Sequence, residues 1–321
     1  MSILVLLVLL PSTLSENITA EENKYLKDHC GKHFLKDPLR NSASIIGGIK
    51  AKQNEFPWIV GLYFKKAIYK PPYWVPLVRG CSGVQVSKRH VLTAAHCMVT
   101  NSPYLDRYCK KGSTVRNRDK YSVEQPGLFT VFVGSDCTNP ELCWKNRTNY
   151  SVVGITVNED YNPCNLDSDL ALVEINPDIS EKHGYPVCMP VPNQTLPSKM
   201  TAVGFGIDTA HPPKEGAVLS DLQSVELTKI FGGPPKTITM GAFDKSVCNG
   251  DSGGPLVRID KDIYTVTGIA IAVIPSCSTR DSRSDGFIRD GPLRKAKLDT
   301  EAKPPNRDEQ QARTIDSDHR L

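Results

Sequence analysis

Short apolar runs, separated by Gly, Pro and Asn, extend from Ile45 to about Arg289. Residues 58–62, 128–133 and 266–273 are three examples, and no internal repeat is visible. Runs of this length, rich in β-forming residues and bounded by turn residues, are typical of strands. The pattern therefore predicts an all-β fold, either a barrel or a sandwich.

The chain begins with an apolar run, residues 3–10, that is too short to span a membrane as a helix. Small residues follow, and the sequence Thr13-Leu14-Ser15 suits signal-peptidase cleavage before Glu16. Residues 1–15 are therefore predicted to be a signal peptide, and a buried strand at the chain start is the alternative. The protein is expected to be secreted and extracellular.

Two polar segments flank the strand-rich region. Residues 16–44 are charged, without a clear period, and are predicted to be a pro-segment. Residues 291–321 mix charges of both signs with Pro304-Pro305, which favours a solvated, largely disordered tail. The domain between them is expected to cover residues 45–290.

Composition narrows the function classes. The 321 residues include 39 Lys or Arg and 35 Asp or Glu, a near balance that argues against a dedicated nucleic-acid binder. No segment after the N-terminal run is expected to span a membrane. Ten cysteines, an even number, agree with disulfides in the secretory pathway. Four sequons agree with a glycoprotein; they begin at Asn17, Asn146, Asn149 and Asn193.

Three short motifs carry the candidate chemistry. They are Leu92-Thr93-Ala94-Ala95-His96-Cys97, Ser168-Asp169-Leu170-Ala171-Leu172-Val173 and Cys248-Asn249-Gly250-Asp251-Ser252-Gly253-Gly254-Pro255-Leu256. The glycines around Ser252 favour a tight turn in which the amides of Gly250 and Ser252 converge as an oxyanion hole. A serine hydroxyl needs a base, which His96 can supply, and a buried Asp169 can orient that base.

Each of these residues also has an ordinary interpretation. His96 could be a core histidine, Ser252 a turn serine, and Asp169 or its neighbour Asp167 a turn cap. The joint geometry that the three motifs demand favours a catalytic triad over three unrelated residues.

The order His96, Asp169, Ser252 and the first and third motifs resemble the trypsin-like (chymotrypsin-clan) serine endopeptidase family. Ile45-Ile46-Gly47-Gly48 resembles the family's mature start. The expanded, cysteine-rich loops resemble a divergent invertebrate branch, such as a nematode one. The resemblance implies two six-stranded antiparallel β-barrels, about residues 45–190 and 191–290, with the active site between them. It implies no cofactor and no metal.

The resemblance also implies three disulfides. They are Cys81–Cys97, Cys248–Cys277 and Cys30–Cys188, of which the last would tether the pro-segment. Cys109, Cys137, Cys143 and Cys164 remain, and their three possible pairings stay open. A metal site made from these four is the weaker alternative, because metal ligands usually lie closer together in the sequence.

Family zymogens are activated when the freed ammonium of the residue matching Ile45 inserts beside the residue matching Asp251. A buried carboxylate without a partner is costly, so this ion pair can drive the rearrangement. Ser44 precedes Ile45, where the family usually has Arg or Lys. A trypsin-like activator would cut after Arg40 instead, so release of Ile45 requires another protease or trimming.

The base of the specificity pocket corresponds to Ser246, and its walls to Val273 and Gly286. A neutral serine cannot pair with a substrate Arg or Lys, so cleavage after small or medium apolar residues is predicted. Ile271 replaces a serine that usually hydrogen-bonds the catalytic aspartate. The family's terminal tryptophan-bearing helix is missing from the sequence.

These observations together predict a secreted serine endopeptidase, made as a zymogen and monomeric. Its expected partners are protein or peptide substrates, an activating protease and protease inhibitors, but neither nucleic acid nor membrane. The main alternative is a protease-like binding or regulatory protein with little turnover; another is a disulfide-rich extracellular module such as an inhibitor. The basic stretch from Lys110 to Lys120 is expected to be a solvated loop, with a heparin or substrate exosite as the alternative.

Overall fold

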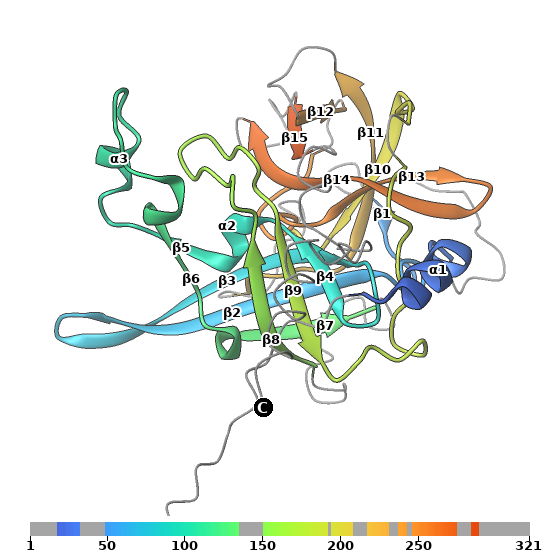
Figure 1. Cartoon of the computed structure of the whole chain (residues 1–321), viewed down its shortest axis with the longest axis horizontal. Helices are drawn as coiled ribbons and strands as arrows, with labels where there is room; N and C mark the ends of the chain where they lie inside the picture. Colours follow the sequence, from blue (N-terminus) through green and yellow to red (C-terminus); the bar gives the residue numbers. More distant parts are fainter. Residues whose placement is uncertain are drawn as a thin grey trace, which may run out of the picture.

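The computed structural model describes residues 18–32, 49–134, 150–191, 194–207, 217–230, 237–242, 246–274 and 284–288; side chains are described outside 272–274 and 284–288. The predicted signal peptide, Ile45 and the charged tail lie outside these ranges. Within them, antiparallel strand is the commonest regular structure, and the strands gather in two large sheets and one small two-stranded sheet (Figure 1). No helix in this part of the chain is both long and apolar enough to cross a membrane.

The first sheet is a closed barrel of six strands. In order around the barrel they are β2 (Ile59–Lys70), β3 (Tyr73–Gln85), β4 (His90–Thr93), β9 (Ala171–Asn176), β8 (Tyr150–Val157) and β7 (Phe129–Val133). Every pairing is antiparallel, and β7 closes the barrel by pairing back onto β2.

The second sheet contains seven strands. In sheet order they are β1 (Ile49–Lys50), β11 (Gln223–Ile230), β10 (Lys199–Gly204), β13 (Pro255–Asp260), β14 (Ile263–Ile274), β15 (Ser284–Ile288) and β12 (Thr237–Gly241). Because β12 also pairs with β11, six of these strands form a closed cycle, and β1 is an extra strand beside β11. The prediction of an all-β fold with two six-stranded antiparallel barrels is confirmed.

Strand patterning explains the core of the first barrel. In β9, Ala171, Val173 and Ile175 are buried while the alternate residues are more exposed, as a strand with one core face requires. A single cluster of buried residues runs through both sheets; it includes Leu62 of β2 and Val266 of β14. The apolar core therefore continues from the first barrel into the second, which also has a separate cluster of its own with members on β10, β11 and β12.

Two features were not predicted. Residues Ala20–His29 of the expected pro-segment form helix α1, whose N-cap Thr19 accepts a hydrogen bond from the amide of Glu22 at 3.1 Å. The expanded loop after α2 (Ala95–Met98), the short helix that carries His96, forms a small outlying unit. Its elements are β5 (Val99–Asn101), α3 (Leu105–Tyr108), η1 (Asn117–Asp119) and β6 (Tyr121–Val123), followed by η2 (Pro126–Leu128).

Candidate active site

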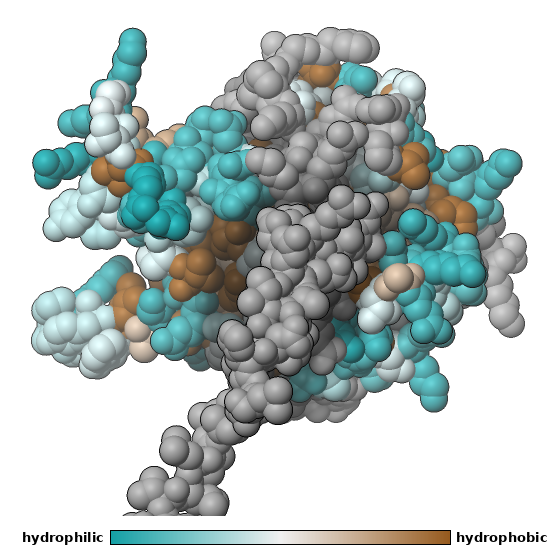
Figure 2. Space-filling view, viewed as in Figure 1, coloured by the Kyte–Doolittle hydropathy of each residue, from teal (hydrophilic) through white to brown (hydrophobic). Residues whose placement is uncertain are grey.

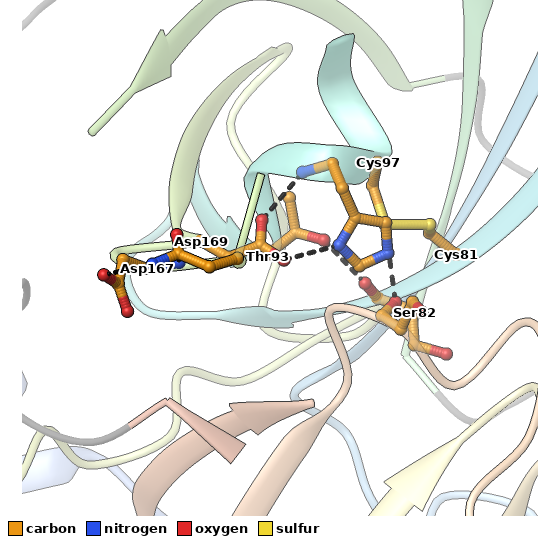
Figure 3. Close-up of polar contacts among 9 residues, drawn as sticks. Cys81, Ser82, Thr93, Cys97, Asp167 and Asp169 are labelled. Carbon is orange, nitrogen blue, oxygen red and sulfur yellow. Dashed lines mark hydrogen bonds and ion pairs between the residues drawn. A yellow bond between two sulfur atoms is a disulfide. The ribbon is translucent and has the colours of Figure 1, made fainter. Parts of the chain in front are cut away.

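The first barrel brings His96 and Asp169 together. His96 lies on α2, three residues after β4, and Asp169 lies two residues before β9, which pairs with β4 through Thr93 and Ala171. His96 Nδ1 is 2.6 Å from Asp169 Oδ2, and the His96 amide donates to Asp169 Oδ1 at 2.8 Å (Figure 3). The Asp169 side chain is fully buried, whereas the imidazole is 28% exposed. A carboxylate that accepts from Nδ1–H leaves Nε2 free to act as a base.

The turn before Asp169 separates it from the neighbouring Asp167. Leu166 and Ser168 have φ angles of 58° and 54°, a left-handed backbone that is costly for residues other than glycine. Asp167 is exposed, and its Oδ2 accepts a hydrogen bond from Asn165 Nδ2 at 2.7 Å. Asp169, on the other side of the turn, faces His96. The turn therefore presents only one of the two aspartates to the imidazole.

A disulfide fixes this turn to the insertion that follows His96. Cys109, just after α3, is bonded to Cys164, five residues before Asp169. The Asn162 side chain supports the same turn by accepting from the Cys164 amide at 3.1 Å. The segments on either side of the His96–Asp169 pair are thus covalently linked. Of the three pairings left open by the sequence, the structure contains one that joins Cys109 and Cys164; Cys137 and Cys143 lie outside the described residues.

Ser252 belongs to the turn before β13 and lies against the first barrel. Its carbonyl oxygen accepts from the Ser82 amide at 2.8 Å. Cys97 Sγ is 3.7 Å from that carbonyl oxygen and 3.8 Å from His96 Nε2. The backbone of Ser252 therefore lies beside the imidazole edge that carries Nε2. Figure 3 shows Cys97, Cys81 and Ser82 grouped at this side of the site.

Glycines make this approach possible. Gly253 has a φ of 81°, and a Cβ added there would lie 2.0 Å from Thr93 Oγ1 and 2.3 Å from the Ser82 carbonyl oxygen. Any side chain would thus collide with β3 and β4 of the first barrel, and the backbone angle would be strained as well. The close contact between the Ser252 turn and the first barrel requires glycine at this position.

Two amides of the turn are left without a partner among the described residues. The amides of Asp251, Gly253 and Gly254 each donate to a backbone carbonyl, whereas those of Gly250 and Ser252 donate to none that the structure describes. These are the two donors predicted to form the oxyanion hole.

The orientation of the Gly250 amide follows from its neighbours. Ile207 donates its amide to the Asn249 carbonyl at 2.8 Å. The N–H of the same peptide group points the opposite way. On the other side of Gly250, the buried Ser82 hydroxyl donates to the Gly250 carbonyl at 2.7 Å and accepts from the Phe205 amide at 2.9 Å. Ser82, which the sequence analysis missed, therefore helps to hold the turn.

Asp251 lies deep beside this turn, with part of its surface accessible. Its two carboxylate oxygens accept from the amides of Gly206 and Cys248, each at 2.8 Å. Burial raises the pKa of Asp251 to about 6, against the lowering effect of these two hydrogen bonds. A Cβ on Gly204 or Gly206 would lie 2.2 Å or 2.1 Å from a carboxylate oxygen, so glycine leaves room for the carboxylate. Ile45, the predicted partner, is outside the described residues.

The surroundings of Asp169 depart from the expected pattern. Ile271, on β14, is 8% exposed and has no polar side-chain atom to offer the aspartate. Tyr161, also missed by the sequence analysis, is 1% exposed, and its hydroxyl has no hydrogen-bond partner among the described residues. Burial, then the charge of Asp169, raises the pKa of Tyr161. No short motif marks this tyrosine in the sequence.

Two of the predicted specificity residues lie on strands of the second sheet, and the third lies in the irregular segment before the Ser252 turn. Ser246 is half-buried, and its hydroxyl donates to the Val247 carbonyl at 2.8 Å. Ala272 pairs with Gly286, and Val273 pairs with Asp285, so the two predicted wall positions are on adjacent strands, β14 and β15. The side chains at these wall positions are outside the described part of the chain.

The remaining cysteines follow the implied pattern where the structure describes them. Cys30 is bonded to Cys188 and Cys81 to Cys97, while Cys248 is disulfide-bonded and its expected partner, Cys277, lies outside the described residues. Cys81, His96 and Cys97 have potential ligand atoms within 4.8 Å of one another. The two sulfurs are bonded to each other, so they offer no thiolate to a metal ion.

Comparison with known proteins places this site in context. A family model described as Trypsin matches residues 45–289. The Spaetzle-processing enzyme of Drosophila melanogaster is 27% identical over 273 residues, covering 76% of this chain and 64% of that protein. CLIP domain-containing serine protease B9 of Anopheles gambiae is 25% identical over 262 residues, covering 74% and 61%. Chymotrypsin-2 of Vespa crabro is 29% identical over 224 residues, covering 66% and 83%. The chain thus spans less than two thirds of the length of the first two relatives.

Proposed function

Given that this chain belongs to the trypsin family, we propose that it is a secreted serine endopeptidase made as a zymogen. The observation that carries the proposal is the 2.6 Å contact between His96 and the buried Asp169, beside a serine turn with two amides that bond to none of the described residues. This arrangement supplies a base, the group that orients the base, and donors for a developing oxyanion.

The proposed reaction passes through an acyl-enzyme. Ser252 Oγ attacks the peptide carbonyl carbon while His96 Nε2 takes its proton, and Asp169 stabilises the resulting imidazolium. The amides of Gly250 and Ser252 bind the oxyanion. When the tetrahedral intermediate collapses, His96 gives the proton to the leaving amine. Water then hydrolyses the ester by the same sequence of proton transfers, with Ser252 as the leaving group.

Activation is proposed to depend on Asp251. Its carboxylate accepts only amide hydrogen bonds from the described residues, and its raised pKa of about 6 reflects the cost of burying the charge. An ammonium released at Ile45 would pair with it and relieve that cost. Because Ser44 precedes Ile45, the activating step requires a protease that cuts after serine, or cleavage after Arg40 followed by trimming.

Specificity is proposed to favour small or medium apolar residues before the scissile bond. Ser246 at the pocket base carries no charge, so a substrate Arg or Lys would be desolvated there without an ionic partner. Paired peptide substrates test this point. We expect faster turnover after Leu or Ala than after Arg, and the reverse order would contradict the proposal.

Replacement of the nucleophile tests the function itself. In correctly processed protein, a fluorophosphonate probe should label Ser252, and Ser252→Ala should lose both the label and about 10⁴-fold or more of kcat. Ser180→Ala serves as a control, because it removes an exposed serine hydroxyl outside the active site and the specificity pocket. Absence of labelling in folded, processed wild type would favour the alternative, a protease-like binding protein. Ile271, which cannot donate to Asp169, is the observation that keeps this alternative in view.

A further inference from the structure

Two arms project from the same end of the molecule. The hairpin arm, residues 65–77, is the outer half of the β2–β3 hairpin, and the insertion arm, residues 99–123, contains β5, α3 and β6. Figure 1 shows both arms at the left of the view, with helix α1 at the opposite end of the long axis. Neither arm contributes a residue to the triad.

Positive charge gathers on these arms. The hairpin arm contains three lysines and no Asp or Glu. The insertion arm contains six Lys or Arg and only two Asp or Glu, which are Asp106 and Asp119. The whole chain has a formal net charge of only +4, so the remainder of the protein does not share this excess. An acidic partner would therefore be attracted to this end of the molecule.

Exposed aromatic rings accompany the charges. The hairpin arm exposes Tyr73 by 72%, Trp74 by 70% and Tyr69 by 54%, and the insertion arm exposes Tyr104 by 60%. Figure 2 shows hydrophobic residues in the hollow between the two projecting arms. Single exposed hydrophobic residues are common, but a group of exposed tyrosine and tryptophan side chains is typical of protein-binding surfaces. Aromatic rings add little to a site for a sulfated polysaccharide, so the composition favours a polypeptide partner.

A buried carboxylate joins the bases of the two arms. Glu124 accepts from Arg79 at 3.3 Å and from Lys66 at 3.2 Å, and it also bonds the Thr100 hydroxyl. Arg79 in turn donates to the Val99 carbonyl at 2.9 Å and lies over the Phe64 ring. This network holds β2, β3 and β5 in one arrangement, so the two arms present a common surface.

The base of the arms is next to the imidazole. Val99, where the insertion arm starts, is three residues after His96, and β3 of the hairpin reaches the site through the Cys81–Cys97 disulfide. In acyl transfer the imidazole protonates the leaving amine, so the leaving-group side of a substrate lies on the side of His96. A substrate chain that continues beyond the scissile bond is therefore directed toward the arms.

We propose that the hairpin and insertion arms form an exosite for an acidic segment on the leaving-group side of a protein substrate. The proposal rests on the proposed function for its direction along the substrate, but binding to the arms does not require turnover. Lys65, Lys70, Lys110 and Lys111 are all exposed and are among the cations available to the acidic segment. Lys66 and Arg79 hold the base of the arms and are not expected to reach it.

Kinetics with matched peptides test the exosite. Three substrates share one cleavage sequence: one ends in a chromogenic amide, and two continue for ten residues that are acidic or basic. We expect higher kcat/KM for the acidic extension, an advantage that decreases as salt is raised. The pair Lys65→Gln and Lys70→Gln, or the pair Lys110→Gln and Lys111→Gln, should reduce kcat/KM for the acidic substrate by roughly 3- to 10-fold. The chromogenic substrate should be unaffected.

A matched control uses Lys24→Gln and Lys27→Gln, which remove two exposed lysines from α1 at the other end of the molecule. This pair should leave all three substrates unchanged. Equal rates for acidic and basic extensions, or equal losses in the arm and control pairs, would overturn the exosite. If no substrate is cleaved, the proposed function fails, and the exosite is then tested by binding alone.

Binding to Ser252→Ala protein provides that separate measurement. Fluorescence anisotropy of the labelled acidic ten-residue peptide should show saturable binding that weakens when either arm pair is substituted. Trp74→Ser should weaken binding without changing net charge. Binding of a heparin oligosaccharide or of anionic phospholipid vesicles, with none of the acidic peptide, would contradict the proposal and assign these arms to a different class of partner.

Discussion

The two halves of the candidate site are held in different ways. The His96–Asp169 half is completed by the first barrel itself: two hydrogen bonds join the residues, and the Cys109–Cys164 disulfide fixes the adjoining segments. The Ser252 half is a glycine-rich turn with two amides that donate to no carbonyl of the described residues. Beside it lies Asp251, an enclosed carboxylate whose hydrogen-bond donors among the described residues are two backbone amides.

This difference indicates where control of activity can be applied. The first half has few alternative arrangements, because covalent and hydrogen-bonded links restrain it from both sides. The second half contains a charge whose cost depends on whether a cation is delivered to it. A protease precursor can therefore fold with its base already oriented while its oxyanion hole forms only on activation. The two halves of the site are thus expected to respond differently to substitution and to pH.

Among substitutions that leave the triad intact, Asp251→Asn gives the largest expected effect. An asparagine cannot attract an ammonium, and its single carbonyl oxygen can accept from only one of the two amides that bond Asp251. In the processed protein, kcat/KM should fall by about 10²- to 10³-fold, the cost typical of losing an oxyanion-hole donor. The covalent label on Ser252 should form correspondingly more slowly. A processed variant with wild-type kcat/KM would contradict the proposed role of Asp251.

The same residue sets a pH response in the unprocessed chain. Its folded pKa of about 6 lies above the unfolded value of 3.8, so its contribution to stability is complete below about pH 3.8 and is lost as the pH rises through 6. The loss by pH 7 is on the order of 3 kcal/mol at most, and less where solvent reaches the carboxylate. Urea unfolding between pH 4 and pH 8 measures it. The dependence should disappear in Asp251→Asn and in protein processed at Ile45.

Removal of the Cys109–Cys164 disulfide should act on the other half. The double variant Cys109→Ala, Cys164→Ala frees a loop closed over 55 residues, which costs roughly 2–4 kcal/mol of stability. The turn that carries the left-handed Leu166 and Ser168 then loses a restraint. On heating, the variant should therefore lose its activity at a lower temperature than the wild type. Thermal unfolding and activity measured over the same temperature range check this expectation. Unchanged unfolding would show that the hydrogen bonds alone hold the half together.

The sequence marks the candidate triad more clearly than it marks the residues that support the triad. His96, Asp169 and Ser252 stand in short motifs whose residue types are tied to one reaction, so local pattern was sufficient to select them. Ser82 acts on Gly250, which is 168 positions away in the sequence, and Tyr161 lies near Asp169, which is 8 positions away. Neither residue is marked by its neighbours in the chain. The glycines that surround Asp251 are likewise explained only by the distances of the folded chain.

The unpredicted parts of the fold have similar causes. Helix α1 is polar on all sides and has no buried residue within its bounds, so it lacks the apolar period that indicates a helix. Its cap at Thr19 and the Cys30–Cys188 bond support it instead. The apolar run of β2 ends at Phe64, and a lysine-rich region follows. The pairing of β2 with β3 nevertheless continues through this region, so the sequence pattern does not show the full length of the hairpin.

The smallest expected effect is a pH response of the first barrel, opposite in direction to that of Asp251. His90 is 3% exposed on β4, and its Nδ1 lies 2.8 Å from Ser87 Oγ. Burial lowers the pKa of His90 below 6.5; Arg89 adds to this effect, while Glu174 and Asp178 oppose it. The folded state thus binds fewer protons than the unfolded state near pH 6, and the stabilising contribution present above pH 6.5 is lost as the pH falls. The opposing carboxylates make this change in stability smaller than that of Asp251.

Urea unfolding of His90→Gln tests this expectation. The free energy of unfolding should decline less from pH 7 to pH 5 than in the wild type, while the control His29→Gln on α1 should follow the wild type. An unaltered decline in His90→Gln would mean that other groups cause the acid sensitivity of the first barrel.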